Sequence, residues 1–192
     1  MLTSTLDLIG LPFEYSLVQN YSEFMDALGR KTSQGVDSHK RVPVLHLSMH
    51  GSHAGLALTD GKFLSWADLN WKLRLLNRKL GHVLIVCLSS CHGLFGLRML
   101  RQETAAGLIE HDPPFRLLIS NLDPVPWSDA AVAFATFYHL LERGRDQFEM
   151  VRAMRMASGN DRFFGLLAGT DVSDEIYVLG TEELVKALQM PS

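Results

Sequence analysis

The chain has 192 residues, of which 47% are hydrophobic and 20% are charged, and its formal net charge is −3. This length and balance are typical of a single globular domain, which we expect to span residues 1–192. The weak negative charge argues against nucleic acid as a partner, and no apolar run reaches the roughly 18 residues of a membrane span.

The first forty residues predict one strand and one helix. Residues 1–7 lack the basic start and apolar core of a secretory signal, so we expect a cytoplasmic protein. Two cysteines are too few to cross-link the chain, and we expect both thiols to be reduced. Residues 13–18 alternate apolar with polar side chains and predict a strand. Residues 22–29 predict a short helix between a serine N-cap and a glycine stop, and residues 30–40 predict an exposed loop.

Two apolar runs end in side chains that could take part in catalysis. Residues 42–49 predict a strand that ends at His50, and residues 83–89 predict a strand that ends at Cys91. A glycine follows each of these side chains within two residues. Neither run has a polar face, which is typical of parallel strands buried on both sides. The carboxyl ends of neighbouring parallel strands meet at one edge of a sheet, so we expect His50 and Cys91 to meet there.

A hairpin and a helix are predicted between these two strands. Residues 55–64 form the hairpin, with Asp60-Gly61 as a two-residue turn in which both residues take positive φ. Ser65 predicts a helix N-cap, and Asp68 is placed to return the hydrogen bond in a variant capping box. Four leucines share the buried face of this helix. They are Leu69, Leu73, Leu76 and Leu80.

The remaining elements complete an α/β pattern. Residues 94–108 predict a helix and residues 115–120 predict a third buried strand. Two helices follow, one opened by Ser128 and Asp129 and one opened by Asp146. The last predicted elements are a strand or strand pair within residues 162–168 and 176–179, and a helix over residues 181–189. Strands separated by helices predict a mostly parallel central sheet with helices on both faces.

Cys91 has the surroundings of a nucleophile. It ends a predicted strand, and a predicted helix begins just after it. Unpaired N–H groups at the start of a helix carry partial positive charge, which favours the nucleophilic thiolate. The alternative is a buried structural cysteine, the commoner use of an unpaired cysteine. We expect that structural role for Cys87, which lies in the middle of the strand.

Three histidines accompany the first of these strands. His50 stands at the strand exit before Gly51, with access and a flexible backbone, and is our candidate general base. His46 lies deeper in the sheet, where a structural or supporting role is expected. His53 lies further into the loop and is the second candidate for the base.

The same residues also allow a metal site. Nitrogen and sulfur ligands for zinc are offered by His46, His50, Cys91 and His92. Their spacing does not match the closely spaced ligand pairs of common zinc sites. We therefore expect no metal and no other cofactor.

Together these motifs resemble the caspase-like (clan CD) superfamily of cysteine peptidases, most closely its bacterial CHAT-domain branch. The resembling segments are the strand ending at 48–51, the hairpin at 56–64, the strand ending at 89–93, the stretch 124–144 and the helix around 151–154. The resemblance covers roughly residues 42–156. The order of the motifs and the 41-residue separation of His50 from Cys91 make the set specific.

The resemblance implies a caspase-like sandwich and an endopeptidase with a Cys-His dyad. His50 would be the base and then the acid for the leaving group, Cys91 the nucleophile, and the N–H groups of Gly51 and Cys91 the oxyanion hole. It also implies cleavage of a protein partner, such as a gasdermin-like pore former, in bacterial antiviral defence or regulated cell death. An activating sensor in trans, or oligomerisation, would control it. The alternatives are a catalytically idle caspase-like interaction module and a His/Cys zinc-binding protein.

The loop after the third strand is a candidate wall of the substrate pocket. It carries Asp123, Trp127 and Asp129 around a proline-stiffened turn. A buried carboxylate there would favour a basic substrate side chain, because arginine binds carboxylates in a bidentate manner. The alternative is structural, with Asp129 in the first turn of a helix and Asp123 in a turn before Pro124.

Overall fold

The computed structural model describes residues 2–35, 43–101, 112–168 and 177–179. The strands of its central sheet are β1 (Val44–Ser48), β5 (Ile85–Ser89), β6 (Leu117–Asn121), β7 (Phe163–Leu167) and β8 (Tyr177–Leu179). They lie in the order β1-β5-β6-β7-β8. Strands β1, β5 and β6 are parallel neighbours, whereas β7 runs antiparallel to both β6 and β8. The predicted α/β fold with a mostly parallel sheet is therefore confirmed, and so is the final strand pair.

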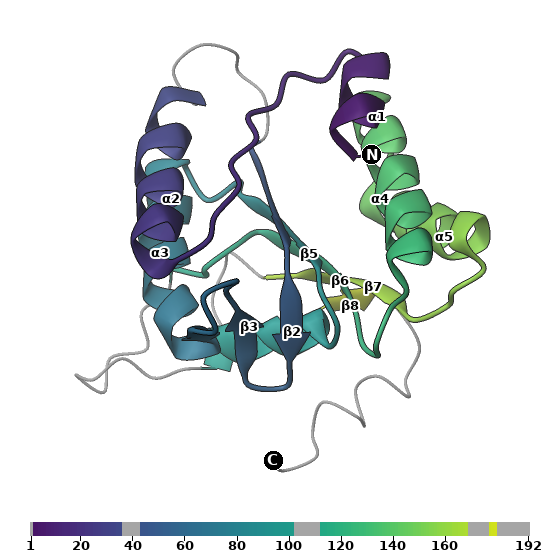
Figure 1. Ribbon diagram of the computed structural model, residues 1–192. Coiled ribbons are helices and arrows are strands. Elements are labelled where there is room, and N and C mark those ends of the chain that lie inside the picture. The colour runs from purple at the N-terminus through teal and green to yellow at the C-terminus, as the bar shows by residue number, and fades with distance from the viewer. Residues whose placement is uncertain (1, 36–42, 102–111, 169–176, 180–192) are drawn as a thin grey trace.

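Helices cover both faces of this sheet, as predicted. They are α1 (Leu2–Leu8), α2 (Tyr21–Gly35), α3 (Trp66–Lys79), the 3₁₀ helix η1 (Gly93–Arg101), α4 (Trp127–Glu142) and α5 (Gln147–Ser158). Helices α2 and α3 lie on one side of the sheet, and α1, α4 and α5 lie on the other (Figure 1). Among the described residues, no helix combines the length and the apolar character that a bilayer crossing needs.

The middle strands of the sheet are buried on both faces. All five side chains of β5 and all five of β6 are buried. Along β5, Val86 and Leu88 pack in the cluster that includes α3 and η1, whereas Ile85 and Cys87 pack in the cluster with α4 and α5. Burying one such aliphatic side chain contributes about 1.5–3 kcal/mol. The two-sided cover explains why this strand has no polar face in the sequence.

A second, small sheet follows β1 directly. It consists of β2 (His50–Ser52), β3 (Gly55–Ala57) and β4 (Phe63–Ser65), all antiparallel. The hairpin between β3 and β4 is the predicted one, but the predicted two-residue turn is wrong. The Leu58 N–H donates to the Lys62 carbonyl at 2.8 Å, and the Gly61 N–H donates to the Leu58 carbonyl at 3.0 Å. Of the two expected turn residues only Gly61 has positive φ, at 81°, so the loop is a three-residue turn with a glycine bulge.

The predicted helix signals around the sheet are largely confirmed. Ser65 caps α3, its hydroxyl accepts from the Asp68 N–H at 3.1 Å, and the Asp68 carboxylate accepts from the Ser65 N–H at 3.1 Å. This reciprocal capping box stabilises a helix start by about 1 kcal/mol. The four predicted leucines of α3 and its end are all buried. Asp146 caps α5 through the Glu149 N–H, as expected.

The N-terminal predictions are partly wrong. Residues 13–18 form no strand, because no partner strand pairs with their alternating pattern, and the helix α1 before them was not predicted. Helix α2 begins at Tyr21, with the Asn20 side chain accepting from the Glu23 N–H at 3.1 Å. It continues through Gly29 to residue 35, because a glycine costs an exposed helix about 1 kcal/mol and does not end it.

Some predictions reach beyond the described residues. The expected loop at 30–40 is helical to residue 35, and its remainder lies outside the described ranges. The helix predicted at 94–108 is the 3₁₀ helix η1 as far as residue 101, and residues 102–108 are not described. The same holds for the helix predicted at 181–189.

Candidate active site

The pairing of β1 with β5 determines where the two candidate catalytic residues lie relative to the sheet. The two strands are parallel and in register from Val44 opposite Ile85 to Ser48 opposite Ser89. His50 and Cys91 each follow two residues after this last pair. Both therefore stand just beyond the carboxyl ends of neighbouring strands, where open α/β sheets place their sites.

A backbone contact joins the segments that follow β1 and β5. A Cβ atom on Gly51 would overlap the carbonyl oxygen of Cys91 and would lie 3.0 Å from the Oγ of Ser90. The backbone of β2 is therefore packed directly on the Cys91 carbonyl and the Ser90 side chain. Only glycine permits this approach, so the close contact, rather than flexibility, is the reason for a glycine after His50.

The turn after Cys91 is tight, and a hydrogen bond ties it to the segment that follows the neighbouring strand β6. The Gly93 N–H donates to the Ser90 carbonyl at 3.2 Å, and His92 has a φ of 55°, which costs a non-glycine residue about 1 kcal/mol. The His92 ring is hydrogen-bonded through Nδ1 to the Leu122 carbonyl at 3.0 Å. A carbonyl can only accept, so Nδ1 carries the proton. A Cβ on Gly93 would overlap the Ser120 hydroxyl, which makes glycine necessary here as well.

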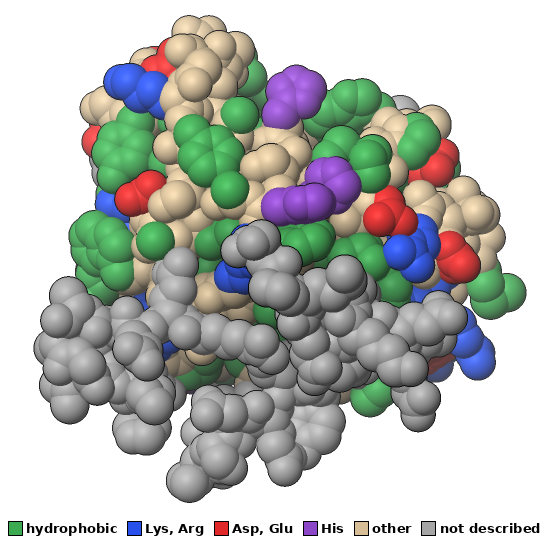
Figure 2. Space-filling view, turned by 90° about the horizontal axis from the view of Figure 1, so that it is seen from below, with side chains coloured by type: hydrophobic (Ala, Val, Ile, Leu, Met, Phe, Trp, Pro, Cys, Tyr) green, Lys and Arg blue, Asp and Glu red, His purple; other side chains and the backbone are tan. Residues whose placement is uncertain are grey.

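The two candidate bases have different surroundings. His50 is exposed, and within the described part of the chain its ring has no hydrogen-bond or ring partner. The His53 ring stacks on Phe95 at a centroid distance of 4.3 Å and meets the edge of His92 at 4.4 Å. Figure 2 shows histidine side chains gathered on the face that is seen from below relative to Figure 1. His50 is thus free to turn toward Cys91, whereas His53 is held in an aromatic cluster.

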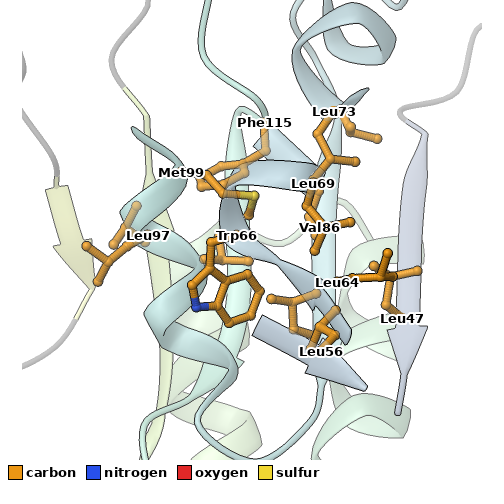
Figure 3. Close-up of a cluster of buried hydrophobic side chains, with 14 of the residues drawn as sticks. Leu47, Leu56, Leu64, Trp66, Leu69, Leu73, Val86, Leu97, Met99 and Phe115 are labelled. Carbon is orange, nitrogen blue, oxygen red and sulfur yellow. The ribbon is translucent and has the colours of Figure 1, made fainter. Parts of the chain in front are cut away.

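The small sheet that carries His50 rests on the larger hydrophobic cluster. Leu56 and Leu64 are almost fully buried, as is Trp66 at the start of α3 (Figure 3). The Trp66 indole N–H donates to the His53 carbonyl at 2.9 Å. The loop after β2 is therefore tied to the core at its far end, which limits the movement of His50.

His46 lies on the face of β1 that packs against α4 and is partly buried. Its Nδ1 is 2.9 Å from the Tyr138 hydroxyl, and its ring centroid is 4.7 Å from that of Phe134. Burial lowers the pKa of His46 to about 4, so the ring is neutral near pH 7. These contacts agree with the structural role expected for it.

Cys87 lies beside this group and is fully buried. Burial raises the pKa of its thiol. The thiolate is therefore disfavoured at Cys87, whereas Cys91 is partly exposed. In the described ranges, no group of three or more His, Cys, Asp or Glu side chains is arranged to hold a metal ion.

In the described part of the chain, no hydrogen bond or ion pair links the three candidate pocket residues to one another. The Asp123 carboxylate is half-exposed and paired with the Arg162 guanidinium at 2.6 Å. Trp127 is 62% exposed at the first residue of α4. Asp129 lies in the first turn of that helix and accepts from the Ser128 hydroxyl at 3.2 Å. The partner at Arg162 neutralises Asp123 and favours the structural alternative for it.

Two polar side chains at this edge are buried. Ser90 and Asn121 are 3% and 1% exposed, and the Ser90 Oγ and Asn121 Oδ1 atoms have no hydrogen-bond partner among the described residues. Tyr138 was not predicted as the hydrogen-bond partner of His46. No local pattern could reveal it, because the two residues lie on different elements far apart in the chain.

A comparison with models of known protein families finds no match, and a comparison with curated proteins finds none either.

The contact of Gly51 with Cys91 predicts a specific sensitivity to side-chain size. Gly51→Ala should lower the free energy of unfolding by about 1–3 kcal/mol, because the new methyl group forces β2 away from the Cys91 carbonyl. Chemical denaturation measures this. Gly29→Ala is the control, since a Cβ there meets no atom within 4 Å. It should leave stability unchanged or raise it slightly. Equal effects of the two changes would contradict the close approach.

His46 predicts a pH dependence of stability. The ordinary histidine pKa of 6.5 falls to about 4 in the folded protein, so the unfolded chain binds more protons between these values. Stability should therefore fall by up to about 3 kcal/mol as the pH drops from roughly 6.5 to 4, and be flat above that range. His46→Asn, which cannot titrate, should remove this slope, whereas His139→Asn at an exposed site of α4 should keep it. Urea unfolding at several pH values measures this dependence. An unchanged slope in His46→Asn would show that His46 is not its source.

Proposed function

We propose that the protein is a cysteine endopeptidase in which His50 and Cys91 form the catalytic dyad. One observation carries the proposal: the β1–β5 register and the contact of Gly51 with Cys91 bring the two residues out of the sheet side by side. His50 takes the thiol proton, and the Cys91 sulfur attacks the scissile carbonyl. His50 then gives the proton to the leaving amine, and water releases the acyl group in a second step.

The backbone around Cys91 supplies the proposed oxyanion hole. Within the described part of the chain, the Cys91 N–H has no hydrogen-bond acceptor. The Gly51 backbone lies against the carbonyl oxygen of the same residue. Helix η1 begins two residues after Cys91, so the positive end of its dipole lies at this turn. N–H groups placed in this way stabilise the negative oxygen of the tetrahedral intermediate.

The wider proposal follows the resemblance to the caspase-like superfamily and its CHAT-domain branch. A mostly parallel sheet with a small antiparallel sheet directly after the histidine strand supports that caspase-like fold. On this proposal the substrate is a specific protein partner, such as a gasdermin-like pore former, in the cytoplasm of a cell under attack. An activating sensor acts in trans. The Asp123–Arg162 pair gives no support for a basic substrate side chain bound by Asp123.

The dyad is tested by alkylation with iodoacetamide and mass mapping of the label. Near neutral pH, wild-type Cys91 should react rapidly, because His50 maintains the thiolate, and Cys87 should stay unlabelled. His50→Ala should slow the labelling of Cys91 by about 10²-fold or more, whereas His53→Ala should change it little. Labelling of Cys87 in place of Cys91 would contradict the proposal, and the reverse order of the two histidine variants would move the base to His53.

Turnover is measured with a peptide library and with proteins co-expressed from neighbouring genes. Cys91→Ala and His50→Ala should each abolish cleavage, and the double variant should be no worse, because the pair acts as one unit. A reactive Cys91 without any Cys91-dependent product would favour the idle interaction module instead.

A further inference from the structure

A stripe of three side chains runs along η1 from the neighbour of Cys91. In a 3₁₀ helix, side chains three residues apart lie one above the other. The Phe95 N–H donates to the His92 carbonyl at 3.0 Å, so this spacing begins at His92 and continues to Arg98. The ring centroids of His92 and Phe95 are 6.2 Å apart, and the guanidinium carbon of Arg98 is 5.2 Å from the Phe95 centroid. We call His92, Phe95 and Arg98 the η1 stripe.

The loop after β2 holds this stripe in place. The His53 ring stacks on Phe95 at 4.3 Å and meets the edge of His92 at 4.4 Å. The Nη1 of Arg98 donates to the His53 carbonyl at 3.3 Å, and the Phe95 ring lies within cation–π distance of its guanidinium. Arg98 is partly exposed, yet two contacts fix where its charge lies. Its guanidinium is therefore oriented before any ligand arrives.

The η1 stripe has positive charge without an acidic partner. An arginine is always charged and has five N–H donors, of which the His53 carbonyl engages one. Among the described residues no carboxylate pairs with Arg98. The Asp123 carbonyl accepts from the His92 N–H at 3.5 Å, but the Asp123 carboxylate is already paired with Arg162. A carboxylate from another molecule is the ligand that matches the free donors of Arg98.

The length of the stripe sets the distance from Cys91 at which such a ligand would bind. Arg98 follows His92 by six residues, and a 3₁₀ helix rises about 2.0 Å per residue, which gives about 12 Å. An extended peptide advances about 3.3 Å per residue. A peptide that lies along the stripe with its reacting carbonyl at Cys91 therefore reaches Arg98 after roughly three to four residues.

We propose that Arg98 is a specificity residue, which binds an acidic side chain of the protein substrate three to four residues from the bond that Cys91 attacks. This inference rests on the proposed function and names the substrate class of that site. Arg98 contacts the substrate but takes no part in activating the thiol. It determines which peptide is bound, whereas His50 determines how fast the thiol reacts.

The test compares peptides that alkylate Cys91. Each is an alanine pentapeptide with a bromoacetyl group at one end or the other, and with Glu or Gln as the third or fourth residue from that group. The Cys91 thiolate forms a thioether and bromide leaves, and mass mapping measures the rate. For at least one of these positions, wild type should react about fivefold faster with the Glu peptide than with its Gln match. Arg98→Gln should bring this ratio to about one.

Arg116→Gln is the matched control, because it removes the same charge at a distant place. Arg116 is exposed and directly precedes β6, at the edge of the sheet opposite to Cys91. This variant should keep the wild-type ratio. Iodoacetamide, which has no peptide part, should label Cys91 at the same rate in the wild type and both variants. The ratio is the decisive quantity, since a general loss of thiol reactivity lowers both peptide rates equally.

The outcomes separate the two proposals. A wild-type Cys91 that iodoacetamide labels no faster than an ordinary thiol near neutral pH overturns the proposed function, and this inference with it. A reactive Cys91 that shows no Glu preference at either position overturns the role of Arg98 alone. The same conclusion follows if the preference persists in Arg98→Gln or is lost equally in Arg116→Gln.

Discussion

The parallel pairing of β1 with β5 is the constraint on which the rest of the structure depends. Its register places positions 50 and 91 at one level, and the glycine at position 51 then allows the two exits to touch. The surrounding elements keep this edge in place. Trp66 anchors the loop after β2, and the His92 ring ties the turn after β5 to the exit of β6. The proposed chemistry therefore needs little beyond two strand ends and a compact turn.

The two faces of the sheet contribute in different ways. On one face, α3 and η1 pack with the small sheet in a hydrophobic cluster, and the buried Asn77 side chain of α3 accepts from the Leu84 N–H at 2.9 Å just before β5. On the other face, α4 packs in a second apolar layer, and its Tyr138 hydroxyl lies 2.9 Å from the Nδ1 of His46 on β1. Each face therefore combines apolar packing with a hydrogen bond from a helix, to the start of β5 on one side and to β1 on the other.

The sequence predicted what local patterns encode. The buried strands β5 and β6 were visible because both of their faces are covered, and the capping box of α3 needs only Ser65 and Asp68. The strand exits at His50 and Cys91 followed from the same runs. Contacts between distant segments were not visible, such as the Asp123–Arg162 pair and the hydrogen bond between Tyr138 and His46. The strand expected at residues 13–18 failed for the same reason, since a strand needs a partner that its own sequence does not specify.

The most direct test of the central claim measures the distance between the two strand exits without relying on activity. His50→Cys introduces a thiol at the end of β1, next to the native Cys91. Mild oxidation should form a disulfide between positions 50 and 91, detected by mass mapping, because such a bond requires Cα atoms within about 7 Å. His53→Cys should not cross-link to Cys91, since that side chain lies against Phe95. Failure of His50→Cys to cross-link, or preferential cross-linking of His53→Cys, would contradict the account.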